Sequence, residues 1–320
     1  MRTGAAADHH GYYHEAVLYG SDEELLAVVL PFLTGGVAAG EPTMVAFGDR
    51  NADLVRSALP RNSGVTFLPG GDVYARPATA IRSYRQLLAD HVAAGATQIR
   101  IIGELQPVLF GPTWDWWARY ESAINHAYDD FPLWSMCGYD TRVTPSAALA
   151  DVVRTHPRTA RPDGRHVPNA DYLPPVDYLR QDRPMVLDPL QHTSPAVELV
   201  DPTPAQARQA VHLAGADRLP ADDLDDLAVA VSETVTNAER HGLPPVWFRL
   251  WTGADRIVVT VSDRGTGPSD PFAGMLPVRG ATAGGLGLWI THQSCSHVSM
   301  QRGADGCTLR LTAGNPHFTA

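Results

Sequence analysis

Prolines gather in one part of this 320-residue chain, between Thr155 and Pro195, where eight of them occur. Proline has no backbone N–H, so it disrupts helix interiors and central strands. The stretch therefore predicts an extended, partly ordered and semi-rigid spacer. It divides the chain into an expected first domain at residues 1–154, the spacer at 155–195 and a second domain at 196–320.

The two expected domains differ in the order of their elements. In the first, strand-like segments alternate with helix-like ones, which favours an α/β domain with a mainly parallel sheet covered on both faces. Its expected strands lie at 14–19, 43–47, 65–68, 98–103 and 133–137. The second domain has grouped helices followed by a meander of strands, which predicts an α+β two-layer sandwich. Its expected helices lie at 204–214, 221–241 and 286–294.

The composition argues against several kinds of function. The chain contains no lysine, so a Walker A loop, Schiff-base chemistry and eukaryotic-type kinase catalysis each lack an essential residue. A net charge of −10 gives no general attraction to nucleic acid, and we expect no direct binding to it. No apolar run reaches the ~20 residues that cross a bilayer, and no signal segment is evident, so we expect a cytoplasmic protein. The three scattered cysteines indicate reduced structural thiols rather than a disulfide or zinc framework.

The helix expected at 221–241 carries the first group of candidate residues. Its apolar residues recur at helical spacing and form one stripe. Glu233, Asn237 and His241 are spaced four apart, so they share one face beside that stripe. Taken alone, the three residues fit a solvated helix face equally well.

Two glycine-rich segments follow that helix. Asp263 ends an expected strand, and Gly265 and Gly267 after it allow the backbone to approach a ligand closely. The run Gly284-Gly285-Leu286-Gly287 opens a helix, whose first N–H groups and dipole favour a bound phosphate. Taken alone, the first segment is weak evidence of a site, and the second is more typical of a flexible loop.

Together and in this order, E-x-x-x-N-A-x-x-H-G, D-x-G-x-G and G-G-L-G-L resemble the N, G1 and G2 boxes of the GHKL (Bergerat-fold) ATPases. The resemblance covers about residues 196–311 and implies that ATP lies between the helix layer and a lid at 268–283. It implies that Asn237 coordinates Mg²⁺, that Asp263 accepts the adenine amino group and that Thr308 assists at the adenine. The nucleotide-binding residues that it implies are Asn237, Asp263, Gly265, Gly267, Gly285, Leu286, Gly287 and Thr308.

Within these ATPases, the sequence E-T-V-T-N-A-E-R-H-G is similar to the corresponding motif of the anti-sigma-factor serine kinases. This resemblance implies that Glu233 is the general base toward a serine hydroxyl of a partner, with Mg²⁺ neutralising developing phosphate charge. It implies a sigma factor and a STAS-type anti-anti-sigma protein as partners, and it favours a homodimer. His241 fits the motif, but we expect it to be structural.

Two other functions stay open at this point. The second domain would be a binding switch if nucleotide only set its affinity for partners, without phosphotransfer. A sensor histidine kinase would need a phospho-accepting histidine followed by an acidic residue and Arg-x-Pro. His14-Glu15 has the acidic residue but lies in an expected strand without the rest of that signature, so we rank serine transfer higher.

Residues 14–145 resemble the MEDS domain (methanogen/methylotroph sensory domain). The residues that carry the likeness are His14 with Leu18-Tyr19, Pro31-Phe32-Leu33 with Gly40-Glu41, Ile99 to Glu104, Tyr120-Glu121, and Cys137-Gly138-Tyr139-Asp140. The likeness implies a sensory module with a RecA-like sheet and no functional P-loop. Polar residues at element ends in such sheets often line clefts, so these residues are the candidates for a sensing site, although such residues more often hold the sheet together by buried hydrogen bonds. The candidates are His14, Glu104, Glu121 and Tyr139.

Overall fold

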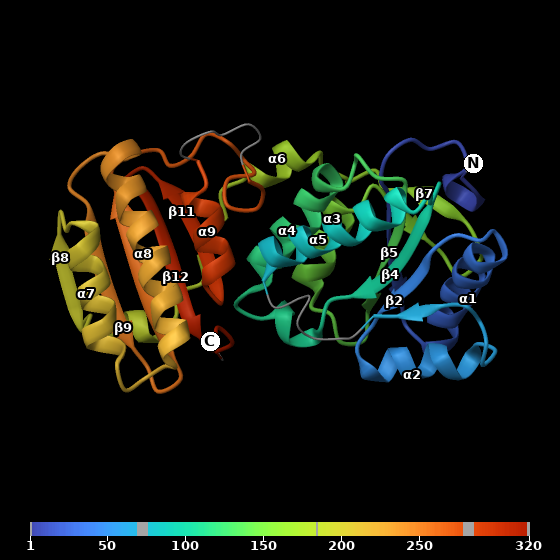
Figure 1. Cartoon of the computed structure of the whole chain (residues 1–320), viewed down its shortest axis with the longest axis horizontal. Coiled ribbons are helices and arrows are strands. Elements are labelled where there is room, and N and C mark those ends of the chain that lie inside the picture. Colours follow the sequence, from blue (N-terminus) through green and yellow to red (C-terminus); the bar gives the residue numbers. More distant parts are fainter. Residues whose placement is uncertain (1, 69–75, 184, 278–284, 319–320) are drawn as a thin grey trace. The chain divides into compact units, whose positions relative to one another are not determined.

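The computed structural model describes residues 2–68, 76–183, 185–277 and 285–318. The chain forms two compact units and passes from the main part of the first to the second between Tyr178 and Leu179. Figure 1 shows a sheet with helices in each unit. The fold classes expected from the sequence are confirmed for both, as the strand pairing of each sheet shows.

The first unit contains a seven-stranded sheet in the order β3-β2-β4-β5-β1-β6-β7. Every neighbouring pair is parallel except β6 and β7, which are antiparallel. The strands are β1 (Tyr13–Tyr19), β2 (Thr43–Ala46), β3 (Thr66–Phe67), β4 (Ile99–Glu104), β5 (Leu133–Asp140), β6 (Arg158–Ala160) and β7 (His166–Pro168). The helices are α1 (Asp22–Ala38), α2 (Asp49–Ala58), α3 (Pro77–Ala93), α4 (Trp114–Ala127), α5 (Ser146–Thr155) and α6 (Pro175–Leu179). The first residues of α3 and α4 and the last residue of α6 belong to the second unit.

Side-chain alternation along β1 separates two layers of this unit. Val17 and Tyr19 face a core cluster that includes Leu25 and Phe32 of α1. His14 and Ala16 face the opposite side, because successive residues of a strand point to opposite faces. The hydroxyl of Ser21 accepts the backbone N–H of Glu24 at 3.2 Å and so begins α1 where the sequence predicts it.

The structure differs from the expected spacer at both of its ends. Residues 158–168 form β6 and β7, because Glu15 and Ala16 of β1 offer an open strand edge to Arg158 and Thr159. Near the other end, the carboxylate of Asp188 binds the guanidinium of Arg256 in the second unit, at 2.9 Å from Nε and 3.0 Å from Nη2. The prolines therefore interrupt regular structure without leaving the whole segment as a spacer.

Among its described residues from Leu179 onward, the second unit is a two-layer sandwich of one antiparallel sheet and three α-helices. The sheet has the order β11-β12-β10-β9-β8, and the contacts of the helices with it place them on one face (Figure 1). The strands are β8 (Val197–Val200), β9 (Trp247–Thr252), β10 (Arg256–Asp263), β11 (His297–Gly303) and β12 (Gly306–Gly314). The helices are α7 (Pro204–Gly215), α8 (Ala221–His241) and α9 (Gly287–Ser294).

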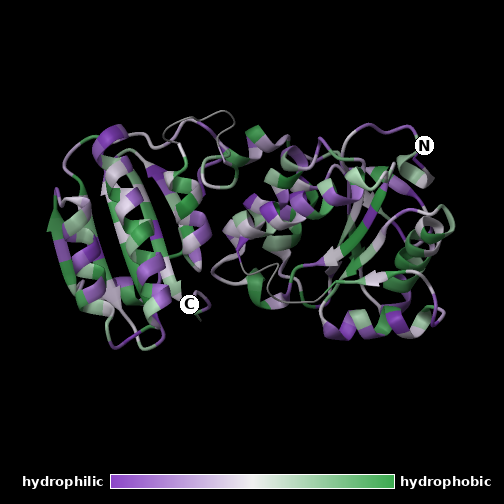
Figure 2. Cartoon of the chain, in the orientation of Figure 1, coloured by the Kyte–Doolittle hydropathy of each residue, from purple (hydrophilic) through white to green (hydrophobic). Residues whose placement is uncertain are grey.

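The α8 helix positions the candidate residues of this unit. Its buried residues include the whole predicted stripe, and Figure 2 shows that the helix carries both hydrophobic and hydrophilic residues. These buried residues are Leu224, Leu227, Ala228, Ala230, Val231, Thr234, Val235 and Ala238. Burial of this stripe against β10 and β12 fixes the helix rotation, and Glu233 and Asn237 then come to its half-buried edge.

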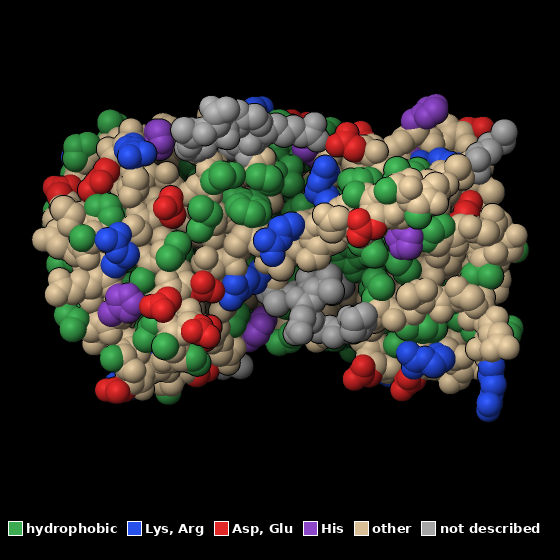
Figure 3. All heavy atoms as spheres, in the orientation of Figure 1, with side chains coloured by type: hydrophobic (Ala, Val, Ile, Leu, Met, Phe, Trp, Pro, Cys, Tyr) green, Lys and Arg blue, Asp and Glu red, His purple; other side chains and the backbone are tan. Residues whose placement is uncertain are grey.

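Charged side chains are scattered over one face of the surface, and the helices were compared with the length and apolar character of a membrane span. Acidic and basic side chains are interspersed with uncharged and apolar ones over the face that Figure 3 displays. On that face the acidic side chains are spread out rather than gathered in one field. Within the described ranges, no helix has the length and apolar character needed to cross a membrane.

Candidate functional site

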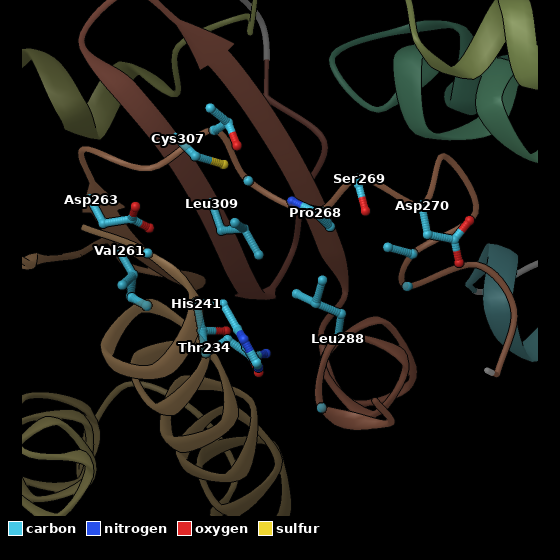
Figure 4. Close-up of a pocket in the computed structure, with 18 of the residues that line it drawn as sticks. Thr234, His241, Val261, Asp263, Pro268, Ser269, Asp270, Leu288, Cys307 and Leu309 are labelled. Atoms are coloured by element: carbon cyan, nitrogen blue, oxygen red, sulfur yellow. The ribbon is translucent and has the colours of Figure 1, made fainter. Parts of the chain in front are cut away.

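A cavity of about 530 Å³ lies in the second unit, at the C-terminal end of α8. Figure 4 shows that four elements surround it: His241 comes from α8, Asp263 from β10, Cys307 from β12 and Leu288 from α9. Apolar side chains such as Val261, Leu288 and Leu309 line it beside the polar groups of His241 and Asp263. A concave, largely apolar site with a few convergent polar groups is typical of a small-molecule pocket.

Asp263 is held in place at one end of the cavity. Its Oδ1 atom accepts the backbone N–H of Gly265 at 2.6 Å and that of Leu243 at 3.2 Å. A Cβ atom on Gly242 would lie 2.5 Å from the same oxygen, so only glycine allows α8 to end this close to β10. Both hydrogen bonds end on Oδ1, and within the described part of the chain Oδ2 is left for a ligand.

The start of α9 lies against α8 at the other end. A Cβ atom on Gly287 would be 2.7 Å from Oε2 of Glu233 and 3.1 Å from Nδ2 of Asn237. The first N–H groups of an eight-residue helix therefore come beside a carboxylate and an amide. Gly285, just before the helix, has a φ of +84°, which side-chain-bearing residues rarely adopt.

Most of the residues implied by the sequence motifs come together here. Five of them line the cavity: Asn237, Asp263, Gly267, Gly285 and Gly287. Gly265 lies behind Asp263 against Gly242, Leu286 is the exposed N-cap of α9, and Glu233 lies beside Gly287. Of the expected lid, Pro268 to Asp270, Ala273, Gly274 and Leu276 line the cavity, while residues 278–283 lie outside the described residues.

The structure corrects the expectation for Thr308. Cys307 and Leu309 line the cavity, so Thr308 between them points to the other face of the sheet. There its hydroxyl donates to the hydroxyl of Ser262 at 2.8 Å, in a second hollow beside Trp247. Cys307 is the residue of β12 that the sequence motifs missed, and the period-two pattern of that strand would have identified it.

Three of the four candidate sensing residues also come together, in the first unit. His14 of β1 lies 3.7 Å from Glu121 of α4, between Nε2 and Oε2. The ring of Tyr139 packs edge-on against His156, with 5.6 Å between centroids. Glu104 lies elsewhere: it accepts hydrogen bonds from Asn51 of α2 at 2.6 Å and from the backbone N–H of Gly48 at 2.9 Å, on the other side of the sheet.

Two members of this cluster, Cys137 and His156, were not among the four candidates. Cys137 is part of the MEDS likeness, but no sensing role was expected for it. Cys137 of β5 and His156, which directly follows α5, lie with His14 and Glu121 so that one ligand atom of each falls within 4.8 Å of the others. His156 lies in the expected spacer, where no strand or helix pattern marked it. Burial raises the pKa of Glu121 to about 8 and lowers the pKa of His156 to about 4. Both pKa values shift because burial disfavours the charged form of each side chain.

Comparisons with known proteins match the two regions separately. Residues 13–157 match the family model of the MEDS domain, described as the methanogen/methylotroph, DcmR sensory domain. Residues 200–313 match the family model of the histidine kinase-like ATPase domain. No curated protein shows a significant match to the chain.

One solved structure that is similar to this chain is the crystal structure of the RsbU and RsbW domains of Rv1364c from Mycobacterium tuberculosis. It is 22% identical over 39% of this chain, with a TM-score of 0.27. The match spans 35% of that chain, which is well under two thirds of its length.

Proposed function

We propose that this chain, a MEDS sensory domain followed by a histidine kinase-like ATPase domain, is an ATP- and Mg²⁺-dependent anti-sigma factor. In this proposal the second domain binds a sigma factor and phosphorylates a STAS-type anti-anti-sigma protein on serine or threonine. The first domain senses a signal and controls that activity. The protein acts in the cytoplasm, as a homodimer.

The observation that carries the proposal is the shape of the cavity in the second domain. It brings Asp263 to one end and Asn237 with the start of α9 to the other, as ATP requires. At the first end, a carboxylate oxygen accepts the adenine amino group. At the other, the N–H groups at Gly285 to Gly287 and the helix dipole bind phosphates, and the side-chain oxygen of Asn237 is a hard ligand suited to Mg²⁺.

The position of Glu233 supports phosphotransfer. Its carboxylate lies beside Gly287, one helical turn before Asn237 on α8. A phosphate bound at the start of α9 would therefore have a carboxylate next to it that can accept a proton from an attacking hydroxyl. General bases placed in this way contribute ~10²–10⁴-fold to rate.

The test is transfer of labelled phosphate from ATP to candidate STAS-type proteins by the full-length chain and by the Glu233→Gln variant. We expect acid-stable phosphoserine or phosphothreonine on a partner, formed ~10²–10⁴-fold more slowly by Glu233→Gln. The matched control is Glu239→Gln, since Glu239 is an exposed carboxylate two residues after Asn237 on the same helix. It should leave both binding and transfer unchanged.

The other functions predict different results. A binding switch would bind nucleotide and change its partner affinity, with no labelled partner and little effect of Glu233→Gln. A histidine kinase would place acid-labile phosphate on its own chain. Either result contradicts the proposed serine or threonine kinase.

A further inference from the structure

Four potential metal ligands converge in the first unit: His14, Glu121, Cys137 and His156. Nε2 of His14 lies 3.4 Å from Sγ of Cys137 and 3.7 Å from Oε2 of Glu121. The same oxygen lies 3.5 Å from Nε2 of His156 and 3.8 Å from the sulfur. Ligands bonded at ~2.0–2.3 Å to one tetrahedral ion are ~3.3–3.7 Å apart. Four of the six separations are close to these values, and the other two are at most 4.8 Å.

The far nitrogen of each histidine has a partner that turns the near nitrogen toward the cluster. Nδ1 of His14 lies 3.0 Å from Oδ1 of Asn125, whose Nδ2 donates to the backbone carbonyl of Thr155 at 2.8 Å and so fixes the amide orientation. Nδ1 of His156 lies 2.8 Å from the carbonyl oxygen of Val152. Both Nδ1 atoms therefore carry the proton, which leaves a lone pair on each Nε2 for a metal ion, as in metal-binding histidines held by outer hydrogen bonds.

One of these nitrogens has no hydrogen-bond partner. Nε2 of His156 is fully buried and, within the described part of the chain, makes no hydrogen bond. Buried polar atoms are rarely left in this way unless a ligand or ion satisfies them. It lies 3.5 Å from Oε2 of Glu121 and within 4.8 Å of the ligand atoms of His14 and Cys137.

The donor set selects the kind of ion. Two imidazoles, a thiolate and a carboxylate suit a borderline ion such as Zn²⁺, whereas Mg²⁺ and Ca²⁺ prefer oxygen ligands alone. A thiolate and a carboxylate bring two negative charges, which a divalent cation balances. Because His14, Glu121 and His156 are at most 2% exposed, such neutrality favours binding.

We propose that His14, Glu121, Cys137 and His156 form a tetrahedral Zn²⁺ site inside the sensory domain. The site links β1 and β5 of the sheet to α4 and to the residue after α5. It is independent of the nucleotide cavity and of the proposed kinase activity.

The experiment uses the full-length chain and Co²⁺, a spectroscopic stand-in for Zn²⁺, under reducing conditions. We expect one equivalent of Co²⁺ to bind, with the visible bands of a tetrahedral ion and a near-ultraviolet thiolate-to-metal band. Zn²⁺ should then remove these bands, since it binds nitrogen and sulfur sites more tightly than Co²⁺. A folded wild-type protein that binds no stoichiometric Co²⁺ or Zn²⁺ would overturn the proposal.

Two conservative variants assign the ligands. Cys137→Ser should abolish the thiolate band, and Glu121→Gln, which keeps the side-chain shape, should weaken Co²⁺ binding at least ~10-fold, as loss of even an outer partner does. The control is Cys295→Ala, a buried free cysteine in the other unit, which should keep the thiolate band. A band that persists in Cys137→Ser and disappears in Cys295→Ala would also overturn the proposal. If Cys137→Ser does not fold, the wild-type titration and Glu121→Gln decide the question.

Discussion

Gly287 lies against Glu233 so closely that a Cβ atom at position 287 would be 2.7 Å from the carboxylate oxygen Oε2. The contact joins the first residue of α9 to the middle of α8. It sets the position of a carboxylate relative to the helix N-terminus that we expect to hold phosphate. Both the phosphate site and the proposed general base therefore depend on the absence of a side chain at one position.

The first prediction tests that contact. Gly287→Ala should push the flexible end of Glu233 aside and slow phosphotransfer at least ~10-fold, while the fold persists because alanine suits a helix better than glycine. Phosphotransfer rates and melting temperatures measure the two effects. Gly303→Ala is the control, since a Cβ atom there meets nothing within 4 Å. Equal rates for the Gly287→Ala variant and the wild type would show that Glu233 does not depend on this contact.

The second prediction concerns recognition of the adenine ring by Asp263. Asp263→Asn keeps an oxygen that can accept the N–H groups of Gly265 and Leu243, but it replaces the other oxygen with an N–H₂ donor. That donor would face the adenine amino group. Loss of a charge-assisted hydrogen bond of ~1.5–3 kcal/mol predicts ~10–100-fold weaker ATP binding.

GTP provides the internal control for Asp263→Asn. Guanine presents a carbonyl oxygen where adenine has its amino group, so the new donor should favour GTP relative to ATP. Calorimetric titration of both nucleotides measures the ratio. An equal loss for ATP and GTP would mean that Asp263 acts on the loop rather than on the base.

The third prediction concerns where the second domain begins. Asp188 is 1% exposed and binds Arg256, whereas the pair between Glu198 and Arg249 is exposed. Asp188→Ala should lower the free energy of unfolding of this domain by ~3–5 kcal/mol, because it leaves a guanidinium without its buried partner. Glu198→Ala should cost at most ~1 kcal/mol. Denaturant unfolding of the fragment 179–320 compares the two, and similar losses would contradict the account.

The sequence predicted the parts of the site that depend on local pattern. The stripe on α8 and the glycines after Asp263 have fixed spacings, and these spacings put Asn237, Asp263 and Gly287 around one cavity. The expectation for Thr308 was wrong because it followed the motif rather than the period of two in its strand, which directs Cys307 into the cavity.

The cluster in the first unit depends on long-range packing instead. His14 and Cys137 lie on neighbouring strands, with Ala16 paired to Cys137. Glu121 and His156 reach the same point from α4 and from the end of α5, and no spacing along the chain relates these four residues. The hairpin of β6 and β7 was missed for a similar reason, since its strands are short and form because β1 has a free edge.

The central claim is that the cavity in the second domain binds ATP through Mg²⁺ and Asn237. Calorimetric titration of ATP, with and without Mg²⁺, into the full-length wild type and Asn237→Ala tests it most directly, with Glu239→Gln as the control on the same helix. The account predicts Mg²⁺-dependent binding that is retained in Glu239→Gln and lost in Asn237→Ala. Binding that is unaffected by Mg²⁺ and by Asn237→Ala, or no binding to the wild type, would contradict it.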